Sequence, residues 1–160
     1  MIGVGYEGRS LPEFIDSLRA ARVTRLVDVR LTPISRKAGF SKGALSAALV
    51  QAGIAYEHRP ALGNPKSNRA GFSGTPDELA HARATFAEQL TRPEAAEALD
   101  HLARAARAEV VAVMCFEADQ ARCHRDVVLA AVAERAGGRP GDRSCAVLRV
   151  EPISPGRRAG

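Results

Sequence analysis

The residues with the most reactive side chains gather in one short stretch, MCFEADQARCHRDVV, at positions 114–128. An apolar run ends in Cys115, Glu117 follows after one residue, and Cys123 and His124 stand next to each other. Thiols act as nucleophiles in enzymes, while carboxylates and imidazoles act as general acids or bases. We therefore take Cys115, Glu117, Cys123 and His124 as candidate catalytic residues.

The surroundings of Cys123 favour its thiolate form. We expect this residue at the start of a helix, where unpaired backbone N–H groups and the helix dipole stabilise negative charge. Arg122 and Arg125 add positive charge nearby. Cys115 could equally be the nucleophile with Cys123 as its resolving partner, and the sequence does not rank the two. The structural alternative is that Cys115 is a small buried hydrophobe at the end of a strand.

The same stretch contains three potential zinc ligands, Cys115, Cys123 and His124. Structural zinc sites generally include a pair of cysteines only a few residues apart, and the pattern C-x7-C-H lacks such a pair. We also expect adjacent cysteine and histidine side chains at a helix start to diverge. The sequence therefore predicts no metal site, and it identifies no cofactor.

A second group of polar residues lies in VDVRLTPISRKAGF, at positions 27–40. Asp28 and Arg30 share one face of an extended strand because side chains alternate along it. Guanidinium groups bind phosphate or carboxylate with two parallel hydrogen bonds, which favours an anion site here. The alternative is a structural Asp28–Arg30 ion pair followed by a solvated loop. The candidate ligand-binding residues are Asp28, Arg30, Arg36, Lys37, Arg125 and Tyr6.

Short apolar runs alternate with longer helical patterns along the chain. The expected strands are 2–6, 25–30, 54–60, 110–116 and 144–152, and the expected helices are 10–22, 42–53, two within 76–107, and 123–137. This alternation predicts right-handed crossovers and a parallel sheet. The fold class is therefore α/β, with three layers and a mostly parallel sheet of about five strands flanked by helices, a flavodoxin/Rossmann-like architecture.

Capping patterns support several of these helix starts. Ser10 and Glu13 have the spacing of a capping box, and the same spacing recurs from Thr75 and from Thr91. Ser41 can cap the helix 42–53. Residues 61–75, in contrast, show no period and are rich in glycine and polar residues, which predicts a long loop. Loops of this length in compact domains are usually functional or mobile.

The elements place both polar groups at one edge of the sheet. The run 110–116 is the most continuously apolar strand, which is typical of a central parallel strand. Cys115 and Glu117 then lie at its carboxyl end, and Arg30 lies at the carboxyl end of the strand 25–30. Ligands of parallel sheets bind outside these ends. We therefore expect the segments near residues 30 and 120 to form one pocket.

The length of 160 residues predicts a single α/β domain over 1–153 with a flexible tail over 154–160. A composition of 46% hydrophobic and 26% charged residues excludes an intrinsically disordered chain. The net charge of +5 and pI of about 9.6 are compatible with phosphates, nucleotides or nucleic acid as partners. Three cysteines and no apolar leader predict a cytoplasmic location without membrane contact, and the oligomeric state stays undetermined.

The motifs together resemble a known family. The segments GYEGRS, LPEFIDSL, LVDVRLTPISRKAGFSKGAL, GIAYEHRPALGNPK, AGF and MCFEADQARCHR are similar, in this order, to the bacterial and archaeal domain of unknown function 488. The resemblance runs from Ile2 to about Arg135. It implies a single α/β domain with a shared site built from Asp28, Arg30, Arg36, Cys115, Glu117, Cys123, His124 and Arg125.

Two functions of different kinds remain open from the sequence. The first is a protein that binds an anionic, phosphate-bearing small molecule and acts as a cysteine-dependent enzyme of undetermined reaction. The second is a nucleic-acid-binding module that uses a basic surface and the loop 61–75. A purely structural knot of hydrogen-bonded cysteine, glutamate, histidine and arginine side chains is a third interpretation.

Overall fold

Four short strands form a parallel β-sheet in residues 1–137, the part of the chain that the computed structural model describes. The strands are β1 (Ile2–Gly5), β2 (Arg25–Asp28), β3 (Ala55–His58) and β4 (Val111–Cys115). All three strand pairs are parallel, as predicted, and the described sheet has four strands rather than about five. The predicted strand 144–152 and the predicted tail 154–160 lie outside the described residues.

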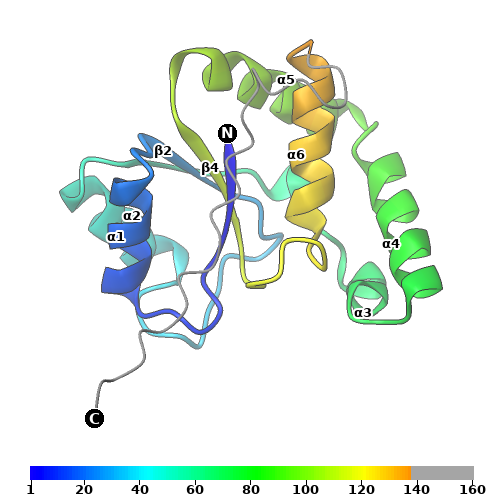
Figure 1. Cartoon of the computed structure of the whole chain (residues 1–160), viewed down its shortest axis with the longest axis horizontal. Helices are drawn as coiled ribbons and strands as arrows, with labels where there is room; N and C mark the ends of the chain where they lie inside the picture. The colour runs from blue at the N-terminus through cyan, green and yellow to red at the C-terminus, as the bar shows by residue number, and fades with distance from the viewer. Residues whose placement is uncertain (138–160) are drawn as a thin grey trace.

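Helices cover both faces of the sheet and make a three-layer α/β architecture (Figure 1). One face carries α1 (Leu11–Ala20) and α2 (Lys42–Gln51), and the other carries α5 (Pro93–Ala108) and α6 (His124–Arg135). The helix α4 (Pro76–Gln89) packs against α6. No helix within residues 1–137 has the length and apolar character needed to cross a membrane.

The side chains of β4 divide between two hydrophobic clusters because they alternate along the strand. Val111, Val113 and Cys115 pack with α5 and α6, whereas Ala112 and Met114 pack with α1 and α2. All five residues are buried. This two-sided burial explains why β4 is the most continuously apolar strand of the chain.

The strand order is β1-β4-β2-β3, which differs from the orders of flavodoxin and of the Rossmann fold. After β3 the chain returns along the opposite face through α4 and α5 and then inserts β4 between β1 and β2. Gly5 pairs in register with Cys115, and Asp28 pairs with Met114. The carboxyl ends of β1, β4 and β2 are therefore neighbours, and Cys115 lies between the other two.

Local hydrogen bonds confirm two of the three predicted capping boxes. The backbone N–H of Ser10 donates to Glu13 at 2.7 Å, and the box that starts at Thr75 is formed in the same way. The box predicted from Thr91 is wrong, because Pro93 fixes the start of α5 and leaves Arg92 at the cap. The Thr91 hydroxyl instead donates to the carbonyl of Glu88, within the preceding turn.

The Ser41 side chain does not cap α2, although Ser41 occupies the cap position. Its hydroxyl instead lies 3.2 Å from the carbonyl oxygen of Ser35 and donates to it. The same hydroxyl accepts from the backbone N–H of Ser35 at 3.4 Å. Ser41 thus ties the loop that follows β2 to the start of α2.

Residues 61–75 form short helical turns rather than the extended loop that the sequence predicts. They contain parts of two 3-10 turns (Pro60–Leu62 and Lys66–Asn68) and the single-turn helix α3 (Arg69–Phe72). The Asn68 amide donates to the carbonyl of Ala82 at 2.9 Å, which holds the segment against α4. Helices of three or four residues are too short to produce a hydrophobic period, so they could not be predicted from the sequence.

Candidate functional site

The two ends of the loop 116–123 bring Cys115 and Cys123 together. Cys115 is the last residue of β4, and Cys123 precedes α6, whose first residue is His124. The buried Arg125 holds the loop in place, because its guanidinium donates to the carbonyl oxygens of Glu117 and Ala118. The loop therefore returns directly over the end of the strand.

The end of β1 forms a second support for this loop. The backbone N–H groups of Tyr6 and Glu7 donate to the carbonyl of Phe116 at 3.1 and 2.9 Å. The backbone of Glu117 passes so close to Gly5 that a Cβ atom at position 5 would collide with its carbonyl. A residue without a side chain is thus required there for the loop to approach the sheet.

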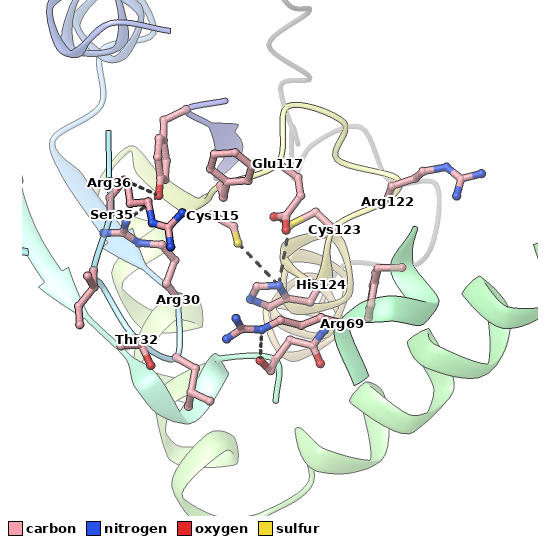
Figure 2. Close-up of a pocket in the computed structure, with 16 residues that line it drawn as sticks. Arg30, Thr32, Ser35, Arg36, Arg69, Cys115, Glu117, Arg122, Cys123 and His124 are labelled. Atoms are coloured by element: carbon pink, nitrogen blue, oxygen red, sulfur yellow. Dashed lines mark hydrogen bonds between the residues drawn. The ribbon is translucent and has the colours of Figure 1, made fainter. Parts of the chain in front are cut away.

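Three potential ligand groups meet at the carboxyl end of β4 (Figure 2). The Nδ1 atom of His124 lies 3.8 Å from the Cys115 sulfur and 3.9 Å from the Cys123 sulfur. The Glu117 carboxylate lies 3.1 Å from the Cys123 sulfur. The expected divergence of Cys123 and His124 is therefore wrong, because the extended backbone of Cys123 at the helix cap turns its side chain back toward the imidazole. We call Cys115, Glu117, Cys123 and His124 the thiol centre.

Electrostatics differ sharply between the two cysteines of the thiol centre. The hydrogen bond with Cys123 and then burial raise the pKa of Cys115 far above its usual value. Burial opposes ionisation of Cys123 too, but hydrogen bonds with Cys115 and His124 and the charge of Arg125 lower its pKa to about 6. The pKa of Glu117 is also lowered: burial opposes this, and hydrogen bonds with both cysteines outweigh it. In its protonated form the Cys123 thiol donates a hydrogen bond to the Glu117 carboxylate 3.1 Å away.

The second half of the site is a buried ion pair at the end of β2. The Arg30 guanidinium donates to both carboxylate oxygens of Asp28, at 2.9 and 2.6 Å, and Asp28 is fully buried. Arg30 also donates to the hydroxyl of Tyr6 and to the carbonyl of Phe40, each at 2.9 Å. Burial lowers the pKa of Arg30, but the bonds with Asp28 more than compensate and raise it. Most donors of Arg30 are thus occupied within the protein.

Tyr56 completes the surroundings of Asp28. Its hydroxyl donates to the second carboxylate oxygen at 2.8 Å. Burial and this hydrogen bond raise the pKa of Tyr56. The Asp28 carboxylate thus has partners on both oxygens, and it does not line the cavity described next.

A cavity of about 340 Å³ joins the two halves of the site. Its lining contains the thiol centre together with Tyr6, Arg30 and Arg36, which confirms that the segments near residues 30 and 120 share one rim. Lys37 and Arg125 do not line it. The complete lining is Tyr6, Arg30, Leu31, Thr32, Ile34, Ser35, Arg36, Asn64, Arg69, Phe72, Cys115, Phe116, Glu117, Arg122, Cys123 and His124.

Nine lining residues were not among the sequence candidates: Leu31, Thr32, Ile34, Ser35, Asn64, Arg69, Phe72, Phe116 and Arg122. Three of them come from 61–75, and the unusual length of that segment was the one available signal of a function. Arg69 donates through Nε to the carbonyl of Asn64 at 3.2 Å, and its guanidinium extends toward the cavity (Figure 2). Arg122 points away from the thiol centre and donates to the carbonyl of Gly74.

Comparisons with known proteins agree with the resemblance of the sequence motifs. The family model described as "Domain of unknown function DUF488" matches residues 10–132, a range that includes both halves of the site. No curated protein and no solved structure matches the chain. Because the matched range covers most of the sequence, this chain belongs to the DUF488 family.

Proposed function

We propose that this protein binds an anionic, phosphate-bearing small molecule in the cavity and acts on it as a cysteine-dependent enzyme. The observation that carries the proposal is that Arg36 and Arg69 line the same cavity as the thiol centre. Neither arginine forms an ion pair with a carboxylate of residues 1–137. Their charges are therefore available to an external anion.

The two arginines suit a phosphate because they come from different segments of the chain and line the same cavity. Arg36 comes from the loop after β2, and Arg69 comes from α3. Both are exposed, and neither has a carboxylate partner within residues 1–137 that an anion would have to displace. Hydrogen bonds between a guanidinium and an anion are stronger than neutral ones, and two guanidinium groups bind from different directions.

The remaining sequence candidates have supporting roles in this proposal. Asp28 and Tyr6 hold Arg30 in place, and Arg30 contributes positive charge to the wall of the cavity. Arg125 is a positioning residue, because its donors are used by the loop 116–123. Lys37 acts only through its charge near the rim.

The rim of the cavity also carries apolar side chains, which indicate the chemical character of the ligand. Leu31, Ile34 and Phe116 line the cavity and are exposed, with Ile34 at 76%. Large exposed apolar side chains that cluster at a pocket are typical of ligand contacts. A ligand that joins an anionic group to an apolar or aromatic portion fits this arrangement.

Anion binding is tested by titrating the reduced, metal-free full chain with inorganic phosphate and pyrophosphate in a calorimeter. Arg36→Gln and Arg69→Gln are each expected to weaken binding by about tenfold or more, because a hydrogen bond to a charged group contributes about 1.5–3 kcal/mol. Arg104→Gln is the matched control, since Arg104 is exposed on α5 and lies outside the cavity lining. Unchanged affinity in both cavity variants contradicts the proposal.

The thiol centre is tested separately from anion binding. Cys115→Ser and Cys123→Ser are expected to abolish turnover of any phosphate ester on which the chain is active, with phosphate affinity within about twofold of the native value. Turnover that survives both substitutions contradicts a cysteine-dependent reaction.

The nucleic-acid alternative makes a different prediction in the same apparatus. Affinity for short duplex and single-stranded oligonucleotides would fall steeply between two salt concentrations, because phosphate contacts release counterions. It would also depend on Lys66 and Arg69 of the segment 61–75 and not on Arg36. Tight oligonucleotide binding with no response to pyrophosphate would favour this alternative over the enzyme.

A further inference from the structure

The thiol centre has the geometry of a metal site, and we infer that Cys115, Cys123 and His124 bind a Zn²⁺ ion. All three ligand atoms lie within 4.8 Å of one another. The inference rests on the proposed function in one respect only: the coordination position that the protein leaves open faces the anion that the cavity is proposed to bind. The site itself stands on the contacts of these three residues.

The distances between the ligand atoms are close to those of tetrahedral zinc. Bonds of about 2.3 Å to sulfur and about 2.0–2.1 Å to nitrogen place a sulfur and a nitrogen ligand about 3.6 Å apart. The two sulfur atoms lie 3.8 and 3.9 Å from Nδ1 of His124. Both sulfur–nitrogen distances are thus within about 0.3 Å of the tetrahedral value, and the two sulfur atoms lie within 4.8 Å of each other.

The imidazole presents the correct nitrogen to the two sulfur atoms. Its other nitrogen, Nε2, lies 3.1 Å from the carbonyl oxygen of Val29, which can only accept a hydrogen bond. Nε2 therefore carries the proton, and the lone pair of Nδ1 faces Cys115 and Cys123. Metal-binding histidines generally donate their second ring N–H to a carbonyl or carboxylate in this way, which fixes the ring orientation.

The three ligands are buried and held by well-ordered elements. Cys115, Cys123 and His124 are 5%, 1% and 6% exposed. One ends a central strand, and the other two start a helix that packs on the sheet. The bonds from Arg125 to the carbonyls of Glu117 and Ala118 fix the loop between them. Such pre-arrangement lowers the ordering cost of metal binding.

The ligand set selects a thiophilic cation. Two thiolates and an imidazole favour zinc over magnesium or calcium, which prefer oxygen ligands. Both sulfur atoms bind the ion as thiolates, so the ion and its two thiolates are together neutral. Metal binding would replace the Cys123 hydrogen bond to Glu117, and the positive ion would then offset the charge of the carboxylate 3.1 Å from the Cys123 sulfur.

Three protein ligands leave the fourth position of a tetrahedral ion open, and this position faces the cavity. All three ligands line the same cavity as Arg36 and Arg69. Zinc sites with three protein ligands and one open position are typical of catalysis, whereas structural sites have four protein ligands. An anion held by the two arginines, or a water molecule beside Glu117, reaches this open position.

Zinc binding is tested on the full chain, reduced and stripped of metal with a chelator. We expect one equivalent of Zn²⁺ by elemental analysis. Co²⁺ in its place should give the near-ultraviolet thiolate-to-metal charge-transfer absorption and the visible bands of a tetrahedral site. Cys115→Ser, Cys123→Ser and His124→Gln should each weaken Zn²⁺ affinity by about 100-fold or more, beyond the 10–100-fold typical of outer partners. The exposed His81→Gln is the matched control that keeps native affinity.

Alkylation of the native chain covers the case in which a variant fails to fold. Zn²⁺ should protect both Cys115 and Cys123 from iodoacetamide, as read by mass spectrometry of the peptides. No zinc binding, or zinc binding that leaves either thiol as reactive as before, overturns the inference. Phosphate titration of the metal-free chain is independent of this result, so failure of the zinc site and failure of the anion pocket are distinguishable.

Discussion

Charged side chains are arranged differently in two regions of the molecule. In the first region, which we call the paired cluster (Arg25, Glu57, Arg59, His101 and Glu109), every charged group has an opposite partner. Arg25 lies 3.2 Å from Glu57 and donates to both carboxylate oxygens of Glu109, at 3.1 and 2.9 Å. Around the cavity, Arg36 and Arg69 have no carboxylate partner within residues 1–137.

The contrast teaches which charges stabilise the fold and which are available to a ligand. In the paired cluster each charged side chain is neutralised by a partner within the protein, so it is not available to bind an external ion. The cavity keeps positive charges without partners beside two buried thiols, an arrangement that adds little to folding. Functional sites typically depart in this way from the rules that the rest of a protein follows.

The largest effect on stability is expected at the buried ion pair between Asp28 and Arg30, at the end of β2. Asp28→Asn leaves Arg30 buried without its counter-charge and should lower the free energy of unfolding by about 3–5 kcal/mol. For a chain of this size that is a fall in Tm of about 6–20 °C, measured by circular dichroism. The control Asp16→Asn, in an exposed pair with Arg19 at 3.8 Å, should stay within about 0.5 kcal/mol. Equal effects of the two substitutions would remove the distinction between buried and exposed pairs.

The second-largest effect is the increase in the free energy of unfolding when Zn²⁺ binds to the thiol centre. Zn²⁺ at about 100 times its Kd should stabilise the fold by about 2.7 kcal/mol, or about 5–10 °C in Tm. A chelator should reverse this, and Cys123→Ser should abolish it. Stabilisation by Zn²⁺ that persists in Cys123→Ser would show that the ion binds outside the thiol centre. The cavity would then differ from the paired cluster for a reason other than zinc binding.

The smallest effect separates the unpartnered arginines from the paired one. Arg25→Gln should lower the free energy of unfolding by about 1 kcal/mol, because it breaks two half-buried ion pairs. Arg36→Gln should change it by less than about 0.5 kcal/mol, because no partner is lost. Urea denaturation measures both values. A cost for Arg36→Gln as large as that for Arg25→Gln would show that Arg36 has a structural partner after all.

The sequence predicts most of the fold where the signal is local. The apolar run of β4, the capping boxes at Ser10 and Thr75, and the polar residues at strand ends each depend on neighbours in the chain. The failed capping box at Thr91 marks the limit of such patterns, because one proline moved the helix start by a single residue.

The sequence predicted that the segments near residues 30 and 120 meet, but it did not predict the strand order or the side-chain contacts that form the site. The insertion of β4 between β1 and β2 depends on how whole elements pack, and it decides which residues border Cys115. The approach of Arg69 to the cavity depends on turns too short to leave a period. The convergence of Cys123 and His124 depends on the backbone angles of one cap residue.

The sequence by itself determined that thiols, an imidazole, a carboxylate and several arginines lie at the carboxyl ends of parallel strands. This follows from hydrogen-bonding and hydrophobic periods that act over a few residues. Only the tertiary structure decided that two sulfur atoms and one imidazole nitrogen lie within 4.8 Å of one another, and which arginines within residues 1–137 have no carboxylate partner. Those outcomes depend on long-range packing and on competition among partners for each buried charge, which no local pattern records.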